Sequence, residues 1–223
     1  MKKLFVYIIL VILSMPVCAA TVIGNWENGS SDGWIDWIEW GNGQSITSPL
    51  NASKYSFSTI GATSGTESLK VTQSGWGQTL AIKLQNNGFV DDFLANTIFQ
   101  IDVTYPATNA AGWQEIWEVA LNAAWYGWNP LSDDPVPTSH VDYGPDGGPQ
   151  KTFTLSFDYS SALSKIGSNP GYVEFILCTN SDAGHGVFYF DNARLVNANE
   201  IVPEPATIAF LGLGLVLFRK RGN

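Results

Sequence analysis

The residues best suited to bind a ligand are aromatic, and they are concentrated in the first part of the chain. All nine tryptophans lie between positions 26 and 128. A single β domain buries only some of these rings, so several should remain at its surface. The apolar face of a pyranose packs on such a ring, while neighbouring polar groups bond to its hydroxyls. Sugar stacking is therefore the chemistry we expect, with Trp76, Trp113, Trp125, Tyr126, Trp128 and Asn129 as candidates.

Residues 129–149 follow the densest aromatic cluster and show no strand pattern. They contain five prolines and four aspartates. A loop of this length inside a compact domain is usually functional or disordered. Its carboxylates could bond to sugar hydroxyls beside the rings. The same rings could instead belong to the core or form a patch for a protein partner, and both alternatives stay open.

Acidic residues give little support for catalysis. A glycosidase needs two carboxylates facing one cleft, about 5–5.5 Å apart for retention or about 6.5–9.5 Å apart for inversion. Glu115 and Glu118 are three positions apart on a predicted strand, so they point to opposite faces unless a bulge intervenes. Glu174 has no second acid beside it, and neither His140 nor His185 has a neighbouring histidine or cysteine. We predict no catalytic residues and no enzyme, with a glycan-active lyase or hydrolase as the alternative.

The elements that must position the aromatic residues are strands. Between residues 21 and 196 short β-branched or aromatic runs alternate with Gly, Asn, Ser, Asp and Pro, a pattern typical of an all-β sandwich. We predict about nine strands, at 21–27, 54–60, 67–73, 79–84, 97–105, 115–122, 151–159, 171–179 and 186–196. Residues 88–94 and 160–166 are predicted to form short helices.

The domain is strongly acidic. Between the two ends of the chain lie six basic and nineteen acidic residues, a net charge near −13. Such a surface repels nucleic acid and anionic lipid but is compatible with divalent cations and neutral sugars. Cys178 is the one cysteine in this part, so no intrachain disulfide can form there. Its apolar neighbours predict a buried, unreactive side chain.

Both ends of the chain carry membrane-directed segments. Lys2 and Lys3 precede a short apolar run, and Ala19-Ala20 provides a cleavage-like site, which predicts a signal peptide over 1–20. At the other end Pro203-Glu204-Pro205 precedes thirteen uncharged residues. As a helix these would span about 20 Å at about 1.5 Å per residue, less than a bilayer core of about 30 Å.

The C-terminal segment ends in Arg219-Lys220-Arg221, which should stay on the cytoplasmic side. With its proline motif and short apolar helix, it resembles the PEP-CTERM sorting signal of exopolysaccharide-producing Gram-negative bacteria. The resemblance implies transient insertion of a transmembrane helix in the inner membrane and processing by a membrane-embedded exosortase. The protein would then be secreted and reside in the cell envelope or extracellular matrix.

Three stretches follow one another along the domain: Asn25-Trp26-Glu27-Asn28-Gly29 followed by Asp32-Gly33-Trp34, then residues 64–71, and then residues 187–195. Together they resemble the jelly-roll carbohydrate-binding modules of the galactose-binding-like superfamily. The resemblance implies that the first and last strands lie side by side. It also implies a structural calcium ion held by Glu27, Asp191 and carbonyls near Glu67; calcium typically takes about 6–8 oxygen ligands. Alternatively, Asp191 caps its strand or pairs with Arg194.

Four parts are therefore expected: a signal peptide (1–20), a jelly-roll β-sandwich (21–196), a linker (197–201) and a sorting signal (202–223). The predicted function is non-catalytic binding of polysaccharide, such as an exopolysaccharide matrix, outside the cell. A structural or adhesive matrix protein that binds other proteins is the main alternative.

Overall fold

The computed structural model describes residues 20–38, 46–73, 78–107, 113–124, 126–133, 150–182 and 186–198. Of residues 37, 38, 46–48, 132 and 133 it describes the backbone alone. The predicted signal peptide and sorting signal lie outside these ranges, as do Trp76, Trp125 and residues 134–149. Within these ranges, no helix has the length and apolar character needed to cross a membrane.

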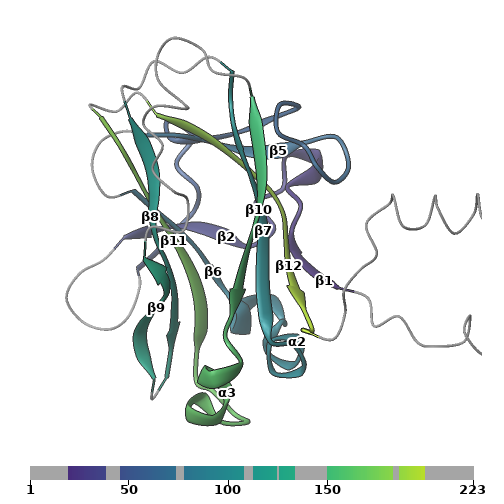
Figure 1. The fold of residues 1–223 in the computed structure, drawn as a ribbon, viewed down its shortest axis with the longest axis vertical. Helices are drawn as coiled ribbons and strands as arrows, with labels where there is room; N and C mark the ends of the chain where they lie inside the picture. The colour runs from purple at the N-terminus through teal and green to yellow at the C-terminus, as the bar shows by residue number, and fades with distance from the viewer. Residues whose placement is uncertain are drawn as a thin grey trace, which may run out of the picture. The chain divides into compact units, whose positions relative to one another are not determined.

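Two antiparallel sheets form the domain (Figure 1). The first sheet has the order β10-β7-β12-β5-β4, with β1 also paired to β12. Its strands are β1 (Thr21–Gly24), β4 (Tyr55–Ser58), β5 (Ser68–Thr72), β7 (Ile98–Tyr105), β10 (Lys151–Asp158) and β12 (Val187–Val196). The pairing of β1 with β12, the first and last strands, is the one that the family resemblance implied.

The second sheet has the order β3-β2-β6-β11-β8-β9. Its strands are β2 (Trp34–Ile38), β3 (Ile46–Ser48), β6 (Gln78–Lys83), β8 (Gln114–Ala123), β9 (Gly127–Asp133) and β11 (Val173–Ser181). Four short helices connect strands: η1 (Glu27–Gly29), η2 (Leu84–Asn87), α2 (Val90–Ala95) and α3 (Ser160–Ile166).

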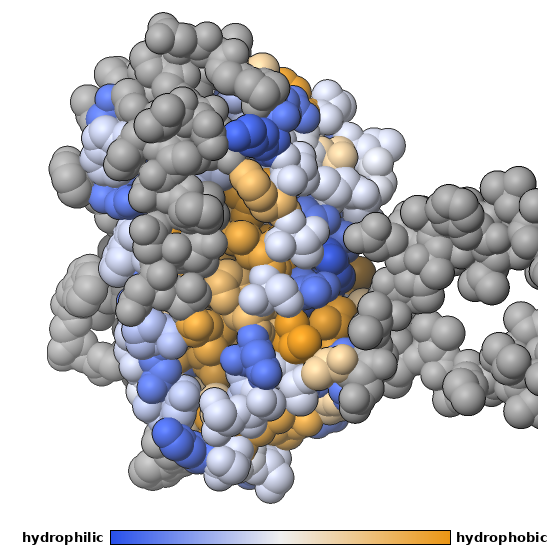
Figure 2. Space-filling model, viewed as in Figure 1, coloured by the Kyte–Doolittle hydropathy of each residue, from blue (hydrophilic) through white to orange (hydrophobic). Residues whose placement is uncertain are grey.

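The core lies between the sheets because apolar residues at alternate strand positions turn inward. In β10 the phenylalanines and the leucine pack toward the core while the intervening threonines and serine are exposed, as predicted. Phe99 of β7 stacks on Phe175 of β11 with ring centroids 4.4 Å apart, which joins the two layers. Figure 2 shows hydrophobic residues reaching the surface along the middle of the face drawn, bordered by hydrophilic ones.

Two tryptophans belong to this core. Trp26 and Trp34 are fully buried, with ring centroids 5.6 Å apart. The indole N–H of Trp34 donates to the carbonyl of Ile23 at 2.9 Å. For these two rings the core alternative of the sequence interpretation is correct.

The nine predicted strands and both predicted helices are present, but β2, β3 and β9 were not predicted. The strand β2 lies in a Trp- and Gly-rich stretch without clear alternation. The strand β9 contains Pro130, which a sequence interpretation takes as a strand breaker. Because β9 is at the edge of its sheet, a missing N–H is tolerated there. The predicted loop 129–149 was therefore wrong at its start, since residues 129–133 belong to a strand.

Candidate functional site

The second sheet has a buried apolar floor on the face turned away from the core. Ala81, Ala120, Ile176 and Cys178 are buried there, on the three central strands β6, β8 and β11. Ile35, Trp117 and Trp128 are partly buried and pack against them. We call this surface the outer face of the second sheet. The four floor residues are fully buried, so the partly exposed side chains of Ile35, Trp117 and Trp128 are the apolar surface that this cluster offers to a ligand.

A β-bulge in β8 brings two glutamates onto the outer face. Cys178 of β11 pairs with Glu118, but the next residue, Thr179, pairs with Ile116, so Trp117 is the extra residue. Because paired residues share a face, Glu118 lies on the side of Cys178. Glu115 pairs with Asn180, two positions from Cys178, and is on the same side. The expectation that Glu115 and Glu118 point to opposite faces was therefore wrong. It had excluded the case of an intervening bulge, and the structure contains that bulge.

Glu118 holds the ring of Trp128. The indole N–H of Trp128, on the edge strand β9, donates to Glu118 Oε1 at 2.8 Å. Glu118 is only 7% exposed, so its carboxylate contributes this bond in a largely dry setting. A charge-assisted hydrogen bond of this kind is stronger than a neutral one and fixes ring orientation. The pair was missed from the sequence because β9, the strand that brings Trp128 beside β8, was not predicted.

The remaining polar residues of the outer face are linked in pairs. Glu174, 3% exposed, forms an ion pair with Lys83 at 3.4 Å and accepts a hydrogen bond from Asn122 at 3.0 Å. The side-chain amide of Asn180 donates to Glu115 at 3.4 Å. Carboxylates and amides on one face, already oriented by neighbours, can bond to hydroxyl groups of a ligand.

Cys178 is buried in the floor, as predicted. Burial raises the pKa of its thiol well above the usual range, and the charge of Glu118 adds to this effect. The thiol therefore stays protonated and unreactive at neutral pH.

The other predicted sugar-binding residues are placed differently. Tyr126 packs against the main core, with the Lys165 ammonium 5.5 Å from its ring centroid. The side-chain amide of Asn129 donates to the carbonyls of Tyr126 and Gly127, at 2.8 and 3.2 Å, and holds the turn between β8 and β9. Trp113 is half-buried just before β8. Of the described candidates, Trp128 alone packs against the floor of the outer face, and Trp117 joins it there.

Glu27 is an anchor for the segment before β5. Its carboxylate accepts the backbone N–H groups of Thr66 and Glu67, at 2.7 and 2.8 Å, and the Thr66 hydroxyl at 2.9 Å. The backbone hydrogen bond from Glu67, followed by the two bonds from Thr66, holds the pKa of Glu27 below its usual value.

Asp191 anchors the same segment from β12. Fully buried, it accepts the backbone N–H groups of Thr63 and Ser64, at 2.5 and 2.7 Å. Burial raises its pKa, and these hydrogen bonds oppose the rise. Arg194 forms its ion pair with Asp102, at 3.5 Å, which corrects the alternative in which it pairs with Asp191.

The carboxylates of Glu27 and Asp191, which were predicted to bind calcium, thus accept hydrogen bonds from backbone N–H groups. Carboxylate oxygens that accept N–H groups in this way already have partners, whereas a calcium ion would need oxygen atoms as its ligands. Across the described residues, no three side chains among His, Cys, Asp and Glu gather in a way that could hold a metal. This arrangement does not fit the predicted shell, and calcium at Glu27 and Asp191 stays a prediction of the sequence.

The C-terminal segment has a recognised motif. Residues 202–221 match the PEP-CTERM protein-sorting motif, which confirms the prediction made from Pro203, Glu204, Pro205 and the basic end. The motif marks a protein for export and sorting to the envelope or the extracellular space. A comparison with curated proteins gave no match.

The sandwich has the jelly-roll fold of carbohydrate-binding modules. The module CBM27-1 of Caldicellulosiruptor saccharolyticus, solved with mannohexaose, is similar with a TM-score of 0.50 and 14% identity over 80% of this chain and 97% of that one. The C-terminal family 22 module of Clostridium thermocellum Xyn10B gives 0.48 and 17% over 83% and 96%. The CBM22-1 xylan-binding domain of Paenibacillus barcinonensis Xyn10C gives 0.45 and 14% over 81% and 97%. At these identities the likeness concerns the fold.

Proposed function

We propose that this protein is exported and binds polysaccharide on the outer face of the second sheet without cleaving it. The observation that carries the proposal is the pair of partly exposed tryptophans, Trp117 and Trp128, packed on a buried apolar floor. Sugar rings stack on the indoles, and the carboxylates and amides around them accept or donate hydrogen bonds to hydroxyls. The jelly-roll fold and the export motif support this function.

Binding without cleavage is consistent with the interactions that the outer-face glutamates make. Glu118 orients Trp128, and Glu174 is tied to Lys83 and Asn122. A general acid in a glycosidase instead needs a proton at neutral pH and free access to the glycosidic oxygen. The carboxylates of this face act as fixed acceptors.

The tail determines where binding takes place. The sorting motif matched at residues 202–221 supports a route to the outside of the cell. An exosortase in the inner membrane of a Gram-negative bacterium processes this segment, and the domain is then released to the envelope or to an exopolysaccharide matrix.

Replacing Trp128 tests the proposal. The full-length chain, kept soluble in a detergent without a sugar headgroup, is run on affinity gels containing mannan and screened on a glycan array. Trp128→Ala should weaken binding at least about tenfold, or ~1.4 kcal/mol, because a stacking platform is lost. Ile60→Ala, which changes an exposed side chain outside the second sheet, is the matched control and should bind normally.

Two results would contradict the proposal. One is retention of full binding by a folded Trp128→Ala, which would place the glycan elsewhere. The other is the absence of any glycan ligand for the wild-type chain, which would favour a protein partner for the aromatic face.

A further inference from the structure

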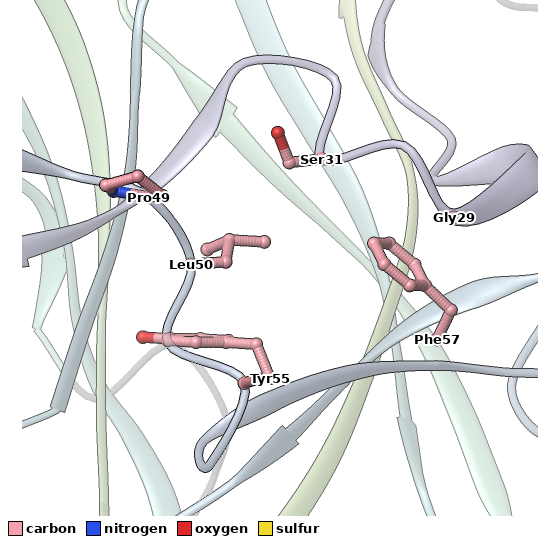
Figure 3. Close-up of a pocket in the computed structure, with 7 residues that line it drawn as sticks. Gly29, Ser31, Pro49, Leu50, Tyr55 and Phe57 are labelled. Atoms are coloured by element: carbon pink, nitrogen blue, oxygen red, sulfur yellow. The ribbon is translucent and has the colours of Figure 1, made fainter.

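A pocket of about 310 Å³ opens at the edge of the sandwich where β4 begins. Its lining comes from three segments: η1 and the residue following Ser30, the chain after β3, and β4 itself. The lining residues are Gly29, Ser31, Pro49, Leu50, Ala52, Tyr55 and Phe57. Figure 3 shows the Phe57 ring across the pocket from Leu50, with the Tyr55 ring along another side.

This pocket is separate from the outer face of the second sheet. The strands β3 and β9 are at opposite edges of that sheet, five strand spacings apart. At about 4.8 Å per spacing, about 24 Å separate the edge beside the pocket from the strand that carries Trp128. A single sugar ring in the pocket cannot touch Trp128.

The chemistry of the lining favours a neutral ring. Phe57 is 36% exposed and is the one aromatic side chain among the large apolar residues that are exposed in the described part of the chain. Leu50 and Pro49 add apolar surface, and the Ser31 hydroxyl adds a polar group. Among the described residues that line the pocket, none has a charged side chain. An apolar wall with few polar groups is the usual composition of a small-molecule site.

Hydrogen bonds hold both walls in place. Asp32 Oδ2 accepts the N–H groups of Asn25 and Trp26, at 2.8 and 2.6 Å, and the N–H of Gly29 donates to Glu67 at 3.0 Å. On the other wall the carbonyl of Asn51 accepts the N–H groups of Lys54 and Tyr55, at 2.8 and 2.9 Å. A site that exists before binding loses little conformational entropy when the ligand arrives.

Gly29 keeps the pocket open beside the aromatic ring. Its φ of +69° is in the left-handed region that favours glycine. A Cβ at this position would lie 3.8 Å from the Phe57 ring and would occupy part of the space that a ligand needs.

We propose that this pocket binds one neutral pyranose residue, at a chain end or a side branch, stacked on Phe57. The volume is at the lower end of the range for small-molecule sites, about 300–1,000 Å³, and suits one ring better than a chain. The choice of a sugar as ligand rests on the proposed function, but the pocket is a second site with its own residues.

Saturation-transfer NMR with single sugars tests this proposal. The full-length chain, in a detergent without a sugar headgroup, is mixed with millimolar methyl mannoside, methyl glucoside or xylose. The wild type should transfer saturation to the ring protons of at least one sugar. Phe57→Ala should lose the signal, whereas Phe57→Tyr, which keeps the ring, should retain it. Ala52→Phe, which adds a ring to the lining and leaves Phe57 in place, should also lose it.

Trp128→Ala separates the two sites. It should retain the single-sugar signal while losing mannan binding, so that failure of the outer face and failure of the pocket give different results. A signal that persists in both Phe57→Ala and Ala52→Phe, or the absence of any signal in the wild type, overturns the proposal. Loss in Trp128→Ala alone would show that the sugar binds on the outer face.

Discussion

Glu118 is the residue on which ring orientation at the outer face depends. Its carboxylate accepts the Trp128 N–H at 2.8 Å and lies close enough to Cys178 to raise the pKa of that thiol. This bond fixes the indole N–H in one direction and so contributes to the orientation of the ring. Stacking on a ring that must first be ordered costs binding free energy.

Substitutions at Glu118 test whether the orientation of the Trp128 ring, and not only its presence, matters for mannan binding. Glu118→Ala removes the acceptor and should weaken mannan binding severalfold, because the hydrogen bond that helps to orient the Trp128 ring is lost. Glu118→Gln keeps an amide oxygen that can accept the same bond and should recover most of the affinity. Affinity gels measure binding, and tryptophan fluorescence reports the ring environment. Equal affinity of the two variants would show that Glu118 does not act through Trp128.

Among the elements, strands with alternating polar and apolar residues were predicted most reliably from the sequence. The strand β10 and the helix α3 have the residues that sequence patterns require, and both were predicted closely. The bulge in β8 could not be predicted, because it depends on pairing with β11, which is more than fifty residues away in the chain. The candidate site was therefore predicted in part: Trp128 was found, Trp117 and Glu118 were missed, and Tyr126 and Asn129 were assigned to a surface they do not share.

The segment before β5 is held by two carboxylates, the buried Asp191 and the partly exposed Glu27. Glu27 holds its residues 66 and 67, and Asp191 holds residues 63 and 64. These hydrogen bonds satisfy both carboxylates without an ion. Treatment with a strong chelator should therefore leave the Tm of the protein unchanged. A fall of several degrees that is reversed by added calcium would instead support the ion predicted from the sequence. Calorimetry with and without chelator measures the difference.

At the scale of the whole molecule, charge limits which polysaccharides can approach. The part of the chain between its two terminal signals has a net charge near −13, and Glu115, Glu118 and Glu174 lie on the outer face with Lys83. A uronate polymer would bring further negative charge to this face, and its carboxylates would meet fixed acceptors where they need donors. A neutral polymer offers hydroxyl donors to the same groups and carries no charge for the domain to repel.

Salt dependence distinguishes these cases. Repulsion between exposed charges acts over about 30 Å at 0.01 M salt and over about 10 Å at 0.1 M. Binding of neutral mannan should therefore change little across this range, whereas polygalacturonate should not bind at low salt and should gain at most weak binding as screening increases. Affinity gels with each polymer at both salt concentrations provide the measurement. Polygalacturonate that bound more tightly at low salt would show that a cationic surface, rather than the acidic outer face, receives the ligand.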